Sequence, residues 1–331
     1  MAAPTASTDA AGKFSWMAEL GIRIEVAASG LIKRELALPE HRIVYLDTRS
    51  PPTPSDDVPI VMLHGFAGDK LNWIRYARHL TSRYRVVIPD LPGFGESDWH
   101  PHLVYSTRNQ AAWLGSLLDA LGIAKAHIAG NSMGGHIATH LAIRAPERVE
   151  TLLLFAPAGT KGAGPPWDET KFKPGEHPLK TYSVEDYDHL LRWVFVKQPM
   201  LIGPVRRYFA MQAVARQPYN QKIFGDITVC EAGNELVEPM LPSLNMPTLV
   251  VWGDTDRLLD CGQARLYETL MPDARAIVLP QCGHMPMAEQ PHHTACASLD
   301  FLQSVRRRSR GEAVEPTPSH ADKLRSGNAG A

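Results

Sequence analysis

The sequence predicts an α/β fold in which a mostly parallel sheet is covered by helices on both faces. Short apolar runs with strand-like patterning alternate, for the most part, with helical patterns, and this alternation is typical of a parallel sheet buried on both sides. The chain has 331 residues, of which 44% are hydrophobic and 21% charged, a balance that allows a large core. Eight strands are expected, at residues 31–38, 42–46, 59–63, 85–88, 126–129, 151–155, 248–252 and 276–279, and the first two should pair antiparallel.

The alternation of strands and helices is interrupted between residues 159 and 244. This stretch holds ten of the 25 aromatic residues and shows short helical patterns, such as residues 184–196 and 205–215. We therefore predict a helical cap at 159–244, inserted into a core formed by residues 31–158 and 245–304. The ends are expected to be an N-terminal tail with an amphipathic helix (1–30) and a disordered C-terminal tail (305–331).

Composition excludes several classes of protein. Lys and Arg total 34 against 35 Asp and Glu, a net charge of −1, whereas a dedicated nucleic-acid binder needs a basic excess. No apolar run reaches the roughly 18–20 residues of a membrane span, and the first residues do not resemble a secretory signal. The four cysteines show no CxxC spacing, so neither a disulfide framework nor a zinc cluster is predicted.

Apolar residues recur at helical spacing between residues 14 and 31, with charged residues on the intervening positions. Such a segment is too charged to span a bilayer. It is expected either to lie on a membrane surface as an amphipathic helix or to pack against the domain. The predicted location of the protein is accordingly cytoplasmic or peripheral to a membrane, with a possible membrane contact through residues 14–31.

A glycine-rich motif, Gly130-Asn131-Ser132-Met133-Gly134-Gly135, stands between a strand candidate and a helical pattern. A sharp turn that holds Ser132 in a strained conformation leaves no room for side chains two residues to either side, which explains the glycines. The turn would present the Ser132 hydroxyl at a helix N-terminus, where the helix dipole favours developing negative charge. Ser132 is therefore the predicted nucleophile.

A serine hydroxyl is a weak nucleophile until a base takes its proton. His284 follows the last strand candidate in a Gly-His turn, and we predict that it acts as general base and then as general acid. An acid should orient its imidazole and stabilise the imidazolium. The candidates for this acid follow the strand at 248–252 and are Asp254, Asp256 and Asp260.

Acyl transfer also needs hydrogen-bond donors for the oxyanion that forms on the attacked carbonyl. The backbone N–H of Met133, directly after the nucleophile, is one predicted donor, and the N–H of Phe66 in the loop His64-Gly65-Phe66-Ala67-Gly68 is the other. The strand-end loop at 90–97 is interpreted as structural. Glu289 is expected to brace the His284 loop and not to act as the catalytic acid.

Five motifs together resemble those of the α/β-hydrolase superfamily over roughly residues 31–304. They are His64-Gly65-Phe66, Asp90-Leu91-Pro92-Gly93-Phe94-Gly95, Gly130-Asn131-Ser132-Met133-Gly134-Gly135, Trp252-Gly253-x-x-Asp256 and Gly283-His284-Met285-Pro286. Members of this superfamily order their triad along the chain as Ser, acid and His, and related sequences carry the acid three residues after the Gly of Trp-Gly. The resemblance thus selects Asp256 as the partner of His284.

Within the superfamily, the chain is most similar to bacterial lipases and membrane-associated phospholipase A1-like enzymes of the monoacylglycerol-lipase branch. The narrower resemblance rests on the segment from His64 to Lys70 with Asn72-Trp73, and on Trp193-Val194-Phe195-Val196-x-x-Pro199. It implies a cofactor-free enzyme, with no metal, that hydrolyses carboxylic esters of medium or long acyl chains through an acyl-enzyme on Ser132. Some of these relatives have an N-terminal membrane anchor, which residues 14–31 are too short and too charged to provide.

Two other functions share this scaffold. Hydrolases that cleave C–C bonds of ring-cleavage products also carry a Gly-Asn-Ser-Met-Gly-Gly turn, but usually with a Trp after the catalytic Gly-His and a Gly-Pro-Gly oxyanion loop. Here Met285 follows His284, and the loop is Gly-Phe-Ala-Gly. The second alternative, a catalytically silent hydrolase fold that binds a ligand, is disfavoured by the complete set of Ser132, Asp256 and His284.

Overall fold

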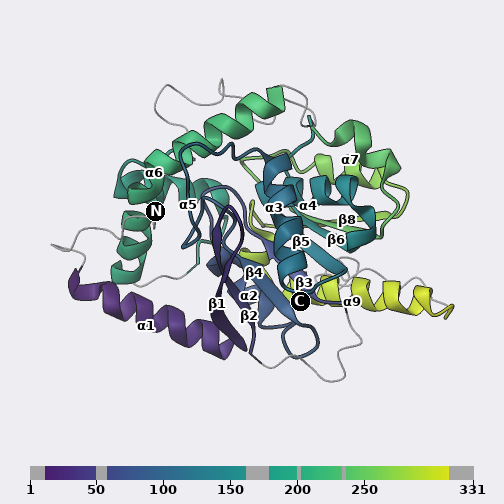
Figure 1. Ribbon diagram of the computed structural model, residues 1–331, viewed down its shortest axis with the longest axis horizontal. Coiled ribbons are helices and arrows are strands. Elements are labelled where there is room, and N and C mark those ends of the chain that lie inside the picture. The colour runs from purple at the N-terminus through teal and green to yellow at the C-terminus, as the bar shows by residue number, and fades with distance from the viewer. Residues whose placement is uncertain (1–11, 50–57, 162–178, 200–202, 233–235, 313–331) are drawn as a thin grey trace, which may run out of the picture.

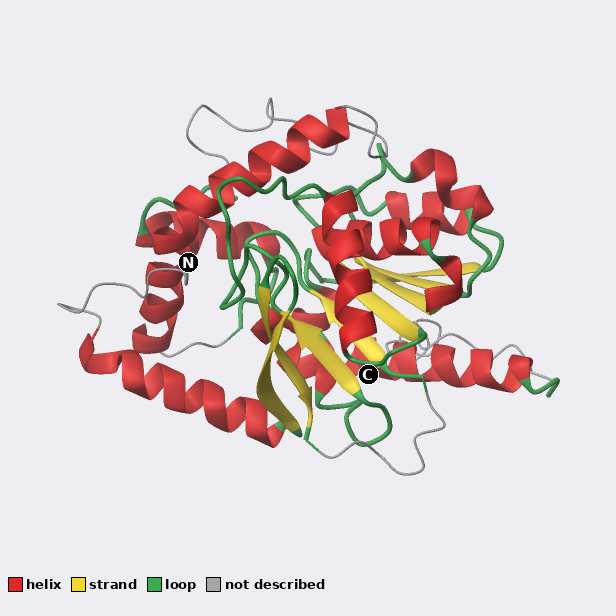
Figure 2. Cartoon of the chain, in the orientation of Figure 1, coloured by secondary structure: helices red, strands yellow, loops and turns green. Residues whose placement is uncertain are grey.

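The computed structural model describes residues 12–49, 58–161, 179–199, 203–232 and 236–312. Its centre is a single eight-stranded sheet with the strand order β1-β2-β4-β3-β5-β6-β7-β8, drawn in yellow in Figure 2. The predictions for the two tails fall at residues 1–11 and 313–331, outside the described residues, as do the cap aromatics Trp167 and Phe172.

The sheet is mostly parallel, as the sequence predicts. The β1–β2 and β2–β4 pairs are antiparallel, and the remaining neighbours run parallel. Strands β3 and β4 are buried at every position, which explains why they lack polar alternation. The strands are β1 (Leu31–Ala37), β2 (Arg42–Thr48), β3 (Ile60–Leu63), β4 (Val86–Pro89), β5 (Ala126–Asn131), β6 (Val149–Phe155), β7 (Thr248–Gly253) and β8 (Ala274–Leu279).

Helices cover both faces of the sheet (Figure 1). One apolar core joins the sheet to α3 (Thr107–Ala120), α4 (Met133–Arg144) and α7 (Gln263–Leu270). The other core joins it to α2 (Ile74–Ala77), α8 (Pro286–Glu289) and α9 (Pro291–Ser309). Short 3₁₀ helices stand at η1 (Lys70–Trp73), η2 (Pro146–Arg148) and η4 (Glu238–Ser243).

Helix α9 continues past residue 304, although the sequence predicts a disordered tail from residue 305 onwards. Phe301, Leu302 and Val305 are buried against the sheet, so the helix still has an apolar face to pack at that point. Three arginines fill its last turn, where cations interact favourably with the helix dipole. The prediction of disorder is therefore wrong for residues 305–309.

Two helices are inserted between β6 and β7, where the cap is predicted. Helix α5 (Val184–Val194) begins with a capping box formed by Ser183 and Asp186. Helix α6 (Gly203–Ala232) is one long helix rather than the short one expected to end near residue 215. It continues through Pro218 because the following turns bury Ile223 and Ile227 in the main core, and this packing outweighs the cost of an interior proline.

The predicted amphipathic helix is present as α1 (Gly12–Ala28). It packs on α6 and β1 and runs along the β1 edge of the molecule (Figure 1). Ala18 is buried in this contact. The opposite side of the helix exposes Trp16, Met17, Leu20 and Ile24, each 40% or more accessible. Among the described residues, no helix is long and apolar enough to cross a bilayer.

Candidate active site

Ser132 occupies a strained turn between β5 and α4. Its backbone φ is +53° with ψ −119°, a conformation that costs free energy for a residue with a side chain. A Cβ added to Gly130 would lie 2.3 Å from the Gly134 carbonyl oxygen, and one added to Gly134 would lie 2.2 Å from that of Leu63. The turn is possible only because both positions are glycine, as the motif predicts.

Asp256 and His284 meet at the carboxyl ends of β7 and β8. His284 Nδ1 and Asp256 Oδ2 are 2.7 Å apart, and both side chains are almost fully buried. Trp252 Nε1 donates to the same carboxylate oxygen at 2.9 Å. The other oxygen accepts the backbone N–H groups of Leu258 and Leu259. With both oxygens held, the carboxylate presents a fixed acceptor that orients the imidazole.

The two competing acids do not reach His284. Asp254 is exposed and accepts a hydrogen bond from the Thr255 hydroxyl at 2.7 Å. Asp260 is also exposed, and its Oδ1 accepts the N–H of Gly262 at 2.8 Å. Of the three candidates, only Asp256 is placed to partner the histidine.

The loop that carries His284 is held from three sides. Asn131 Nδ2, from the residue before Ser132, donates to the His284 carbonyl at 3.0 Å, and the His284 N–H donates to the Val194 carbonyl at the end of α5 at 2.8 Å. Glu289 accepts the N–H of Gly283 at 2.9 Å and that of Lys197, in the cap, at 2.6 Å. Glu289 therefore braces the loop by its backbone contacts and ties it to the inserted segment.

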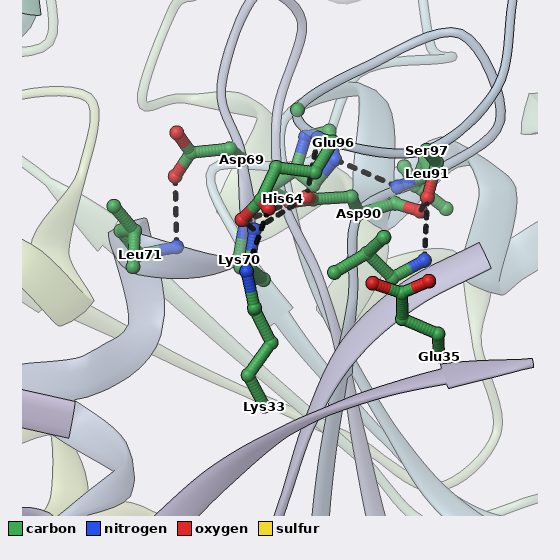
Figure 3. Close-up of polar contacts among 12 residues, drawn as sticks. Lys33, Glu35, His64, Asp69, Lys70, Leu71, Asp90, Leu91, Glu96 and Ser97 are labelled. Atoms are coloured by element: carbon green, nitrogen blue, oxygen red, sulfur yellow. Dashed lines mark hydrogen bonds and ion pairs between the residues drawn. The ribbon is translucent and has the colours of Figure 1, made fainter. Parts of the chain in front are cut away.

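The two predicted oxyanion donors belong to Met133, which follows Ser132 in the chain, and to Phe66. Met133 is the first residue of α4, so its N–H has no acceptor within the helix, and Phe66 lines the same cavity as Ser132. Behind the Phe66 loop, Lys70 Nζ lies 2.6 Å from Asp90 and 2.8 Å from Glu96 (Figure 3). Burial lowers the pKa of Lys70, but these carboxylates raise it by more and keep the ammonium charged.

His64, at the start of this loop, is a buried neutral imidazole. Its Nε2 accepts the Leu91 N–H at 3.0 Å, and its Nδ1 lies 2.8 Å from the Gly65 carbonyl oxygen, which assigns the ring proton to Nδ1. Burial lowers the pKa of His64 to about 4, against smaller raising effects from Asp90 and the Gly65 carbonyl. The loop at 90–97, interpreted as structural from the sequence, is thus the support of the Phe66 loop.

A cavity of about 290 Å³ connects these elements. Its lining includes Ser132, His284 and Phe66, together with residues of α1, α5 and α6. The described residues contain no cluster of His, Cys, Asp and Glu that could hold a metal. The cavity is thus a pocket at the ends of the strands, roofed by the inserted helices.

Comparison with known proteins places the fold in a family. The family model for the alpha/beta hydrolase family matches residues 60–296. The chain belongs to this family. It is 35% identical to Lipase 1 of Psychrobacter immobilis over 72% of this chain and 74% of that one. A membrane phospholipase A described as a bacterial virulence factor superposes with a TM-score of 0.83 at 36% identity, covering 89% of this chain and 93% of the other.

More distant relatives cleave another kind of bond. A 2-hydroxy-6-oxo-6-phenylhexa-2,4-dienoate hydrolase of Burkholderia cepacia is 32% identical over 73% of this chain and 87% of its own. The family and its lipase relatives confirm the predicted fold, the predicted resemblance and the prediction of an ester hydrolase.

Several residues of the cavity were not predicted from sequence. Glu25 and Ile22 of α1, Asp69 of the Phe66 loop and Asn220 of α6 all line it. Asp69 directly follows the predicted loop at residues 64–68, and Ile22 lies within the predicted amphipathic helix. Their positions in the sequence could therefore have indicated both residues. No sequence signal indicates Asn220, because the helical pattern of the cap does not show which face of α6 is turned toward the cavity.

Proposed function

We propose that the protein is a serine hydrolase that cleaves carboxylic esters of medium or long acyl chains through an acyl-enzyme on Ser132. The observation that carries the proposal is the hydrogen-bonded pair of Asp256 and His284, which lies at the cavity that also contains Ser132. A hydroxyl, an imidazole and an orienting carboxylate are the set that acyl transfer requires. The lipase relatives support an ester as the substrate.

In the proposed reaction, Ser132, His284 and Asp256 have different roles. Ser132 Oγ attacks the ester carbonyl while His284 takes its proton, and Asp256 stabilises the resulting imidazolium. The N–H groups of Met133 and Phe66 hold the oxyanion, and each such donor lowers the barrier by on the order of 3 kcal/mol. His284 then gives its proton to the departing alcohol, and afterwards activates the water that releases the acid.

The acyl chain has an apolar wall to pack against. The C-terminal part of α5 and the His284 loop form a small apolar cluster, with Leu191, Val194 and Phe195 at its centre and Leu258 and Met285 against it. All five residues line the cavity. Each methylene buried there should contribute about 0.8 kcal/mol to binding, so we expect kcat/KM to rise with acyl length until the cavity is full.

A series of p-nitrophenyl esters with S132A as the variant tests the proposal. Ser132→Ala should lower kcat by on the order of 10⁶ while the circular dichroism spectrum is unchanged. Ser116→Ala, which removes an exposed hydroxyl on α3, is the matched control and should keep full activity. A loss of less than about tenfold in S132A would refute the assignment of the nucleophile.

C–C bond hydrolysis is the second candidate, favoured by the dienoate hydrolase relatives at 32% identity. The Gly-Asn-Ser-Met-Gly-Gly turn serves both chemistries, so the turn alone does not separate them. A dienone ring-cleavage substrate measured beside the ester series does. If the dienone is consumed and every ester is inert, the ester proposal fails and C–C hydrolysis takes its place.

We further propose that α1 contacts a membrane surface. Its exposed side carries Trp16, Leu20 and Ile24, while Ile22 and Glu25 of the same helix line the cavity. A lipid that leaves a bilayer at this helix would therefore arrive at the rim of the cavity. Apolar side chains at an interface, with charges on the other positions, are typical of a helix lying in the plane of a membrane.

Vesicle sedimentation with a double variant tests this contact. Leu20→Glu with Ile24→Glu should lower binding to phosphatidylcholine vesicles at least about tenfold, because each leucine-sized side chain contributes roughly 1.5–3 kcal/mol when buried. Val229→Glu, on an exposed position of α6, is the control. Unchanged vesicle binding, or a deletion of residues 1–30 that lowers only the melting temperature, would show that α1 serves packing alone.

A further inference from the structure

Helix α6 of the cap reaches the strand-end loop at residues 90–97 through Arg216. The guanidinium donates to the carbonyl oxygens of Gly95, at 2.6 Å, and of Gly93. A Cβ added to Gly95 would lie 2.1 Å from the carboxyl carbon of Asp90, so the backbone of the loop lies directly against that side chain. Because a guanidinium presents its donors in a rigid fork, one arginine joins the cap to the loop at two points.

The peptide group between Gly95 and Glu96 is hydrogen-bonded at both ends. Its carbonyl oxygen accepts from Arg216, and its N–H, which belongs to Glu96, donates to Asp90 Oδ2 at 2.7 Å. A peptide group is planar and stiff, so a shift of its carbonyl end also shifts its N–H end. Arg216 and Asp90 are therefore connected through a single rigid unit.

Asp90 in turn holds the chain where it leaves the Phe66 loop. Its carboxylate is fully buried. Oδ1 accepts the backbone N–H of Lys70 at 2.8 Å, and Oδ2 lies 2.6 Å from Lys70 Nζ (Figure 3). Charge-assisted hydrogen bonds of this kind are among the strongest in proteins, so the carboxylate fixes both the main chain and the side chain of Lys70.

Ring contacts connect the same three parts of the chain. Phe94, from the loop at 90–97, packs edge-on against Phe66, with 5.9 Å between centroids, and against His64, with 5.3 Å. The ring of Phe66 also packs against Phe224 of α6, at 5.4 Å. Phe94 is fully buried. Because protein interiors are close-packed, a shift of α6 or of the loop is transmitted through these rings to the Phe66 backbone.

We propose that Arg216 is a positioning residue for the oxyanion hole, which places the Phe66 N–H by way of the loop at 90–97 and Asp90. The inference rests on the proposed ester hydrolysis, in which that N–H holds the oxyanion. Such a donor is effective at about 2.7–3.1 Å from the oxyanion, so a small displacement weakens it. Because the charge develops on the oxygen only in the transition state, the loss should fall on kcat and not on KM.

Substitution of Arg216 in the full-length protein tests this role. Arg216→Met keeps the aliphatic stem and removes the donors. On p-nitrophenyl decanoate it should lower kcat about tenfold, a part of the roughly 10²–10³ that loss of a whole oxyanion donor costs, and change KM by less than about twofold. Arg216→Lys keeps the charge but lacks the fork, so its kcat should lie between those of R216M and the wild type.

A matched control comes from the same helix. Arg206 also extends from α6, but it pairs with Asp188 of α5 at 2.7 Å and does not line the cavity. Arg206→Met therefore removes a contact within the cap without touching the loop at 90–97. Its kcat and KM should both stay within about twofold of the wild type.

A transition-state analogue gives a readout that the stability of the cap alone would not change. Ser132 Oγ adds to the carbonyl carbon of 1,1,1-trifluorododecan-2-one, His284 takes the proton, and the ketone oxygen becomes an oxyanion in the hole. The inhibition constant divided by KM should rise about tenfold in R216M and stay constant in R206M.

Several outcomes would overturn the proposal. A rise in KM with kcat unchanged would make Arg216 a substrate-binding residue, and equal losses of kcat in R216M and R206M would make it a support of the cap. Loss of the urea unfolding transition in R216M would likewise assign Arg216 to the stability of the fold. An active wild type with an unchanged R216M refutes the positioning role alone, whereas a wild type that hydrolyses no p-nitrophenyl ester refutes the proposed function itself.

Discussion

Acidification should weaken the fold through His64, whose imidazole stands at the start of the Phe66 loop. Its Nε2 accepts the Leu91 N–H. A proton added to that nitrogen would therefore replace this hydrogen bond with a repulsive contact between two N–H donors in a fully buried site. The native protein therefore keeps His64 neutral, and burial lowers its pKa from 6.5 to about 4. The unfolded chain binds the proton at the ordinary pKa, and acid thus favours unfolding.

The sign and the size of the effect follow from these two pKa values. The stabilising contribution is fully present above pH 6.5 and is lost as the pH falls from 6.5 to 4, because over that range only the unfolded chain is protonated. The complete shift corresponds to about 3 kcal/mol. At pH 5 the loss from His64 should be about 2 kcal/mol relative to pH 7.5.

Urea denaturation at several pH values between 7.5 and 4.5, followed by tryptophan fluorescence, measures this loss. Burial also lowers the pKa of His41 to about 4, so the informative quantity is the difference between variant and wild type. His64→Gln cannot titrate, and its free energy of unfolding should fall by about 2 kcal/mol less than that of the wild type between pH 7.5 and pH 5. His102→Gln, at an exposed position, is the control. An unchanged pH dependence in H64Q would refute the reasoning.

Two further predictions concern the turns around the site. Gly134→Ala puts a Cβ 2.2 Å from the Leu63 carbonyl oxygen and should cost about 1–3 kcal/mol of stability and most of the ester activity. The control is Gly115→Ala, whose added Cβ has nothing within 4 Å and should stabilise α3 by up to about 1 kcal/mol. Equal urea midpoints for the two variants would contradict this prediction. Glu289→Gln weakens the acceptor of the Gly283 and Lys197 N–H groups and should lower the free energy of unfolding in the same assay by about 1–2 kcal/mol. Because the His284 loop is then held less firmly, kcat on p-nitrophenyl esters should also fall. An unchanged kcat would show that Glu289 does not position His284.

The sequence allows the candidate residues of the site to be predicted because each of them follows the end of a strand. Parallel strands end at one edge of the sheet, so the topology places Ser132 after β5, Asp256 after β7 and His284 after β8 at the same edge. Local sterics add the rest, since only a glycine at 130 and at 134 fits the turn. Strand patterning and turn chemistry depend on residues that are close in the sequence, so both can be recognised from the sequence alone.

The sequence predicts the cap less well than the core, for a physical reason. Its helices have no sheet edge to fix their direction, and α6 continues through Pro218 because Ile223 and Ile227 find partners in the main core. Those partners are far away in the sequence, and a helical pattern alone does not identify which residues the helix packs against. The face of α6 that lines the cavity, and with it Asn220, depends on the same long-range contacts.

This division between core and cap bears on how relatives come to cleave different bonds. The strand-end loops that hold Ser132 and His284 are constrained by the packed sheet, so they tolerate little change. The cap contacts the core through backbone carbonyls, as in the bond from the His284 N–H to Val194 and the bonds from Arg216 to Gly93 and Gly95. A side-chain substitution on α5 or α6 can thus alter what fits beside Ser132 while the pair of Asp256 and His284 keeps its place. The comparison between lipases and C–C hydrolases of this family should therefore begin with the residues that line the cavity from the cap.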